Sequence, residues 1–136
     1  MDHSIPQLCI RQKKAMRIIT FSRFDEHSSP LFKSLKIIKF LDLETFYLAI
    51  FMYKYHNQLL PPVFISFLTK ITQIHSYNTR LAAKQSYYLP KARTNYGIFN
   101  IRFQGPSVWN SIDEDIKSSS LSLFKKKMNQ YFIKDY

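Results

Sequence analysis

The chain has 136 residues, the size of one average domain and enough to bury a hydrophobic core. Apolar residues make up 46% of it, which excludes wholesale disorder, and its two glycines are too few for a Gly-rich phosphate loop. Twenty Lys and Arg against nine Asp and Glu give a net charge of +11. This excess favours a polyanionic partner such as RNA or DNA, although charge alone fits a basic, soluble surface equally well.

Cysteine usage and hydropathy indicate the compartment. Cys9 is the only cysteine, so no internal disulfide forms, and we expect a reducing, intracellular location, cytoplasmic or nuclear. No apolar signal segment follows the start of the chain. The longest uncharged apolar run, residues 46–53, is far shorter than the roughly 20 residues that a membrane span needs. We therefore expect no membrane partner.

Residues 1–68 are expected to be helical. Residues 8–20 form an amphipathic pattern, with Leu8, Ala15 and Ile19 on one face and the cations Lys13, Lys14 and Arg17 on the opposite face. A short helix over residues 30–37 follows the possible cap Ser29. A third helix opens near Asp42, taken as its N-cap, and ends near residue 57. Because residues 46–53 are apolar or aromatic throughout, we expect this helix to form the core, with a further short helix at 63–68.

Residues 69–112 are expected to form a loop and one short antiparallel β-hairpin. Residues 87–89 and 98–103 are rich in aromatic and β-branched side chains, as strands are, and residues 94–97 have turn composition. Gly105 and Pro106 would end the second strand, and a helical turn after them would point Trp109 inward. Residues 113–136 are expected to form the last helix, with apolar residues at helical spacing from Leu121 to Phe132. The expected fold is a mainly α-helical single domain, residues 1–136, with one hairpin.

Nothing in the sequence indicates a metal or catalytic site. Cys9 and the four histidines lack the close paired spacing of zinc ligands, and no histidine is placed near Cys9 to activate it. The acidic residues 113–115 form a lone triplet, whereas two-metal phosphoryl transfer gathers carboxylates from separate segments. We expect no metal, no cofactor and no polymerase, nuclease or hydrolase activity.

The positive indication is an acid-free middle region. Residues 45–112 contain no Asp or Glu, and the segments HSYNTR (75–80) and RTNY (93–96) combine basic and aromatic residues, which suits single-stranded nucleic acid. Arg80, Arg93 and Arg102 are the candidate contacts there, because a guanidinium forks onto phosphate oxygens. The alternative is that most of these aromatic residues fill the core while the cations are solvated.

A series of segments spans nearly the whole chain and resembles a known family. In order, the segments are QKKAMRII (12–19), PLFKSLKI (30–37), FMYK (51–54), LLP (59–61), HSYNTR (75–80), RTNYG (93–97), GPSVWNSI (105–112) and residues 119–127 around Phe124 and Lys125. Their order and spacing resemble the region that follows the polymerase core in LINE-type non-LTR retrotransposon reverse transcriptases, particularly jockey-like elements.

The resemblance implies that the first helix is the end of a polymerase thumb, and that template RNA, target DNA and the parent polymerase core are the partners. The palm motif, aromatic-x-Asp-Asp, and the upstream endonuclease are absent, so the chain looks like a catalytically inactive fragment or a truncated copy. Two hypotheses remain: a nucleic-acid-binding accessory domain, and a structural module that packs on the polymerase core. A translated relic without activity is a third possibility.

Overall fold

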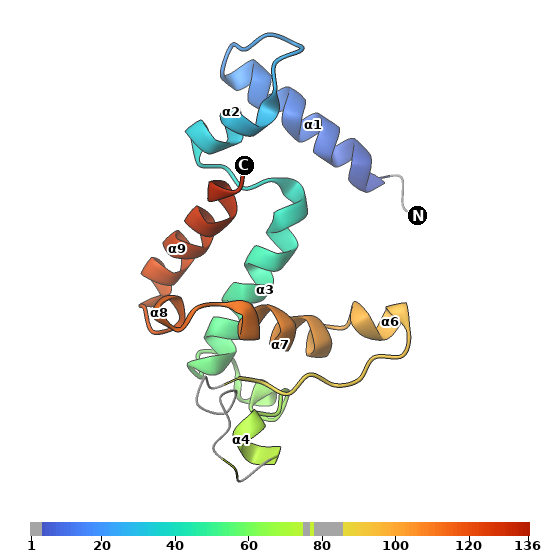
Figure 1. Cartoon of the computed structure of the whole chain (residues 1–136), viewed down its shortest axis with the longest axis vertical. Coiled ribbons are helices and arrows are strands. Elements are labelled where there is room, and N and C mark those ends of the chain that lie inside the picture. The colour runs from blue at the N-terminus through green and yellow to red at the C-terminus, as the bar shows by residue number, and fades with distance from the viewer. Residues whose placement is uncertain (1–3, 75–76, 78–85) are drawn as a thin grey trace. The chain divides into compact units, whose positions relative to one another are not determined.

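The computed structural model describes residues 4–74, 77 and 86–136, and most of these residues are helical (Figure 1). The elements are α1 (Ser4–Ile19), α2 (Ser28–Leu35), α3 (Phe40–His56), the 3₁₀ turn η1 (Pro62–Phe64), α4 (Ile71–Ile74), α6 (Asn95–Ile98), α7 (Ile101–Ser111), α8 (Glu114–Lys117) and α9 (Leu121–Lys134). The expected mainly α-helical class is confirmed. The chain forms two compact units: unit 1 (Met1–Phe46 and Lys125–Tyr136) and unit 2 (Tyr47–Phe124). The single-domain expectation stays a prediction.

The expected third helix is confirmed as α3, whereas the helix expected over residues 113–136 is divided into α8 and α9. Helix α3 ends one residue before the expected position, and its buried residues, Ala49, Ile50, Met52 and Tyr53, lie in the apolar run expected to form the core. Helix α9 buries Phe124 and Met128, which belong to the expected apolar stripe. Asp42 is not the N-cap of α3, because the helix begins at Phe40. Its carboxylate has another partner in unit 1.

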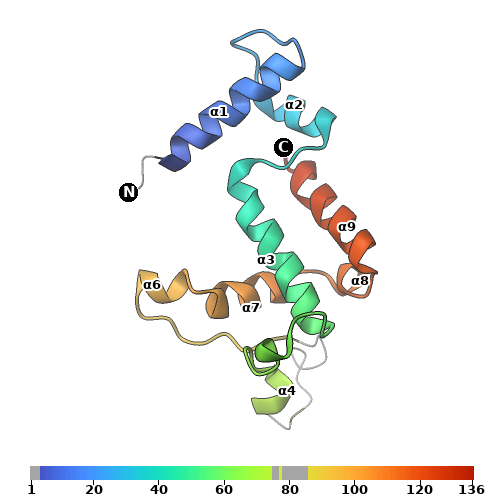
Figure 2. The ribbon, with the colours of Figure 1, turned by 180° about the vertical axis from the view of Figure 1, so that it is seen from behind.

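Unit 1 is built where α1 and α2 pack together, as both views of the ribbon show (Figures 1 and 2). Met16 of α1 is buried against Leu31 and Phe32 of α2. The ring of Tyr136 packs against this cluster. Its hydroxyl accepts a hydrogen bond of 2.9 Å from the amide of Lys39 and donates one of 2.5 Å to Asp42. Burial and the bond to Asp42 raise the pKa of Tyr136 to about 12, so the phenol stays a neutral donor at neutral pH.

The apolar residues predicted to share one face of the first helix are exposed on α1. Leu8, Ala15 and Ile19 are exposed, whereas Met16 is buried. The inward side instead contains Gln12, whose amide nitrogen donates to the carbonyl of Ile38 at 3.0 Å and whose amide oxygen accepts from the Phe40 amide at 2.8 Å. A polar side chain can occupy this interface because both ends of its amide are hydrogen-bonded.

Three helices end on an L-residue in the left-handed conformation. Phe21, Lys36 and Gln58 have φ values of 52°, 55° and 56° after α1, α2 and α3. In each case the next amide bonds back over five residues: Ser22 to the carbonyl of Arg17, Ile37 to that of Phe32, and Leu59 to that of Lys54. This is the Schellman arrangement, in which glycine is usually the left-handed residue. A chain with two glycines makes these turns at a conformational cost.

In unit 2, Trp109 of α7 lies at the centre of an aromatic cluster. Its indole is fully buried, stacks on His56 at 4.9 Å between ring centroids, and contacts Tyr87 and Phe124 edge-on or tilted. The expectation that Trp109 points inward is confirmed. Burial raises the pKa of Tyr87, and the neighbouring phenol of Tyr55 adds to the shift.

Helix α7 approaches α3 closely at Gly105. A Cβ atom added there would lie 2.8 Å from the sulfur of Met52, so the bare backbone of glycine leaves room for that side chain. Asn110 then holds the segment before α6: its amide oxygen accepts from the Tyr87 amide at 2.9 Å, and its amide nitrogen donates to the Tyr87 carbonyl at 2.8 Å.

The predicted β-hairpin is wrong. Residues 86–103 lie in the described part of the chain and contain no strand; their single β contact is an isolated antiparallel bridge between Lys70 and Tyr87. Residues 98–103 are largely helical because Thr94 caps α6, accepting from the Gly97 amide at 3.2 Å, and Asn100 caps α7, accepting from the Arg102 amide at 2.9 Å. Pro106 lies inside α7 rather than ending an element.

Substitutions at Lys36 measure the free-energy cost of a left-handed backbone conformation at a residue other than glycine. We expect Lys36→Gly to raise the free energy of unfolding by roughly 1 kcal/mol relative to Lys36→Ala, because alanine keeps the steric strain of positive φ and glycine removes it. Urea denaturation of both variants and the parent tests this. Lys36 is exposed, so loss of its side chain is common to both variants. Equal stabilities of the two variants would contradict the strain.

Candidate nucleic-acid interface

The three cations predicted on the first helix have different environments. Lys13 and Lys14 are both exposed on α1. Successive residues of a helix are about 100° apart, so the two side chains point in different directions. Arg17 is half-buried, and its Nε donates to the backbone carbonyl of Glu26 at 2.9 Å. Arg17 therefore fastens the loop after α1, while the two lysines are available to a ligand.

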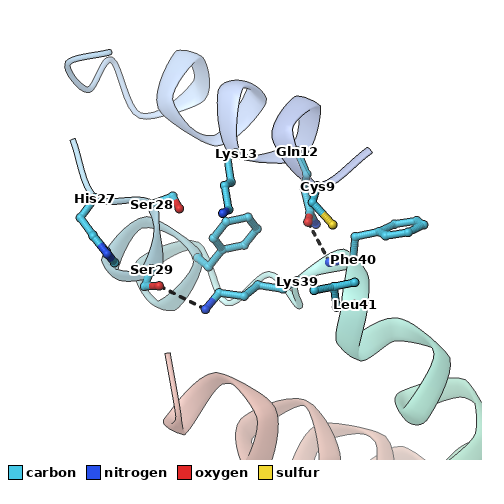
Figure 3. A pocket seen from close by; sticks show the side chains of 10 residues that line it. Cys9, Gln12, Lys13, His27, Ser28, Ser29, Lys39, Phe40 and Leu41 are labelled. Carbon is cyan, nitrogen blue, oxygen red and sulfur yellow. Dashed lines mark hydrogen bonds between the residues drawn. The ribbon is translucent and has the colours of Figure 1, made fainter. Parts of the chain in front are cut away.

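Lys13 reaches a pocket of about 200 Å³ inside unit 1 (Figure 3). Three segments line it: Cys9, Gln12 and Lys13 from α1; His27, Ser28, Ser29 and Phe32 from the start of α2; and Lys39, Phe40 and Leu41 from the start of α3. Lys14 is not among these residues. The hydrogen bonds of Gln12 to Ile38 and Phe40 fix α1 to the start of α3 and so hold two walls of the pocket together.

The pocket is cationic. Lys13 and Lys39 line it, and none of its lining residues is Asp or Glu. The ammonium of Lys39 donates to the hydroxyl of Ser29 at 3.1 Å and lies 3.9 Å from the ring centroid of Tyr136. These two contacts restrict the Lys39 side chain and keep its ammonium at the pocket. Sequence analysis missed Lys39, because only the fold brings it beside Lys13.

The predicted arginines of the middle region belong to unit 2, whereas the predicted cations of α1 belong to unit 1. The middle arginines differ in their contacts. Arg80 lies outside the described residues. Arg93 is exposed in the segment before α6 and makes no interaction with the described residues. Arg102 is exposed on α7, but its guanidinium lies 4.8 Å from the ring centroid of Phe67. Arg102 therefore supports the packing of unit 2, and Arg93 remains the free contact candidate.

Exposed aromatic residues accompany Arg93. Tyr96 of α6 is 88% exposed, and Phe99, the residue after that helix, is 72% exposed. Tyr77, from the HSYNTR segment, is also largely exposed. Such rings can stack on unpaired bases. Trp109, Tyr87 and Phe124 are instead buried in the core of unit 2.

Comparison of the chain with protein-family models, with curated proteins and with solved structures gives no match. In the part of the chain that the structure describes, no helix is long and apolar enough to span a membrane. Within the same residues, no group of three or more His, Cys, Asp and Glu side chains could hold a metal ion.

Arg102 and Arg93 form a matched pair for separating packing from ligand contact. We expect Arg102→Ala to lower the free energy of unfolding by roughly 0.5–1 kcal/mol, the value of a cation–π contact at an exposed site, and Arg93→Ala to leave it unchanged. Chemical denaturation of both variants tests this. An equal effect of the two substitutions would show that the contact with Phe67 adds nothing.

Proposed function

We propose that this chain is the catalytically inactive C-terminal region of a LINE-type non-LTR retrotransposon reverse transcriptase, and that it contacts template RNA or target DNA through basic surfaces. The observation that carries the proposal is the ordered series of segments from QKKAMRII (12–19) to residues 119–127, which covers nearly the whole chain. The absence of the palm motif from the sequence supports the lack of polymerase activity.

The positions of the candidate residues support nucleic-acid contact. Lys13 and Lys14 are exposed side by side in the sequence of α1, the helix that resembles the end of a polymerase thumb. Lysines so placed contact backbone phosphates, which contributes affinity for any sequence. In unit 2, Arg93 lies near in sequence to the exposed ring of Tyr96, a combination suited to unpaired bases.

Removing both α1 lysines tests this surface. We expect Lys13→Gln with Lys14→Gln to weaken binding to RNA of any sequence, and to lower the slope of log affinity against log salt by about one unit per phosphate contact removed. The measurement is fluorescence anisotropy with labelled RNA over a range of salt concentrations. The matched control is Lys125→Gln with Lys126→Gln, which removes the same charge from exposed positions of α9. A salt slope equal to that of the parent would show that Lys13 and Lys14 do not contact phosphates.

A second candidate function has its own supporting observation. The outward side of α1 is apolar: Leu8, Ile18 and Ile19 are 42%, 74% and 58% exposed. Phe21 and Phe24, in the loop after α1, are 97% and 83% exposed. Apolar side chains gathered on one exposed helix and its loop are typical of a surface that packs against another protein segment. This favours the structural module that packs on the polymerase core.

The two candidates respond to different substitutions. If α1 packs on the polymerase core, Ile18→Ser with Ile19→Ser should weaken capture of this chain by a separately expressed polymerase core of the parent element at least tenfold, since each buried isoleucine contributes about 1.5–3 kcal/mol. Lys13→Gln alone should be captured normally, because Lys13 lies about 140° around the helix axis from Ile18. Unchanged capture of the isoleucine variant would exclude this surface, and RNA binding by that variant would then be the remaining function.

A further inference from the structure

Helix α2 begins at the unit 1 pocket without a cap. Its N-cap residue, His27, makes no side-chain hydrogen bond to the helix, and the first turn contains no acidic residue. The amides of Ser28 and Ser29 have no backbone acceptor among the described residues, and Pro30 has no N–H. The start of a helix carries a partial positive charge, so it stabilises an anion placed beside these amides.

Ser28 is a second and independent indication of a ligand. The residue is only 7% exposed and lines the pocket, yet its hydroxyl forms no hydrogen bond within the described part of the chain. Its hydroxyl points toward the side of the pocket where the end of Lys13 lies (Figure 3). The small exposed part of Ser28 lies at the pocket, so its hydroxyl is open to a ligand there. An acceptor oxygen brought into the pocket would satisfy it.

The charged groups around the Ser28 hydroxyl indicate which chemical class of ligand the pocket would bind. Lys39 is held in place by Ser29 and by the ring of Tyr136, and Lys13 enters from α1. The donors thus come from three segments, and no lining residue is acidic. Converging donors of this kind suit a tetrahedral oxyanion, which has several acceptor oxygens, better than a neutral ligand.

We propose that this pocket is a phosphate subsite formed by Lys13, Ser28, Ser29 and Lys39 at the start of α2. Resting on the proposed function, the ligand is one backbone phosphate of bound RNA or DNA, and free phosphate is the other source of the same chemistry. A contact of this type fixes the position of the strand on α1 and reads no sequence.

Amide NMR of the full chain, titrated with inorganic phosphate and with chloride at equal ionic strength, tests the pocket. Saturable shifts of the Ser28 and Leu31 amides with phosphate alone are expected. In Ser29→Asp the new carboxylate favours the helix start, so α2 is kept, but it competes with phosphate. We expect affinity to fall roughly tenfold or more, as the loss of one charge-assisted bond implies. Absence of saturable shifts in the parent would overturn the proposal, as would unchanged affinity in Ser29→Asp.

A uridine decamer then distinguishes the two sources of phosphate. If a backbone phosphate is the ligand, the decamer shifts the same amides, inorganic phosphate competes with it, and Lys13→Gln lowers RNA affinity at least threefold more than Lys14→Gln. The two lysines are neighbours of equal charge, and only Lys13 lines the pocket. RNA binding that falls equally in both variants and ignores Ser29→Asp would overturn the subsite and leave the proposed function intact. Saturable phosphate shifts without RNA binding would uphold the subsite and refute the proposed function.

Discussion

The hydrogen bonds of Gln12 are the constraint on which unit 1 depends. The amide nitrogen donates to the Ile38 carbonyl and the amide oxygen accepts from the Phe40 amide, so two hydrogen bonds attach α1 to the start of α3. This attachment sets which side of α1 faces inward. Met16, one helical turn further on, is buried against α2. Lys13, the residue after Gln12, reaches the pocket, and the apolar residues of α1 remain outside.

Helical periodicity predicted most of the fold because it is a local property. Both α3 and α9 follow from local features, an apolar run in α3 and apolar residues at helical spacing in α9, and need no knowledge of distant contacts. The hairpin failed because strand propensity at residues 98–103 depends on a partner strand, whereas the caps Thr94 and Asn100 act within a few residues. Periodicity could not predict the inward position of Gln12, because Gln12 is polar and only the fold supplies its two backbone partners.

The candidate site could also be predicted only in part from the sequence. Lys13 could be selected from the sequence because it lies on an amphipathic helix with other cations. Lys39 could not, since it lies in the link before α3, and its place beside Ser29 and Tyr136 is a tertiary arrangement. Arg102 shows the opposite error. It was selected from the sequence as a ligand contact, but its guanidinium packs on the ring of Phe67. The sequence identifies the charged residues, and the fold determines which of them already contact other residues of the chain.

The two functions proposed for α1 can be carried out together. Met16 and Gln12 lie on the inward side of the helix, and Lys13, the residue after Gln12, lines the pocket. Ile18 lies five positions beyond Lys13, about 140° around the helix axis, so it points well away from the pocket. A polymerase core packed on the Ile18 side would therefore leave Lys13 and the pocket open to a strand. Burial of that apolar side would also hold α1 in place, and a held helix binds phosphate at a lower cost in conformational freedom than a mobile one.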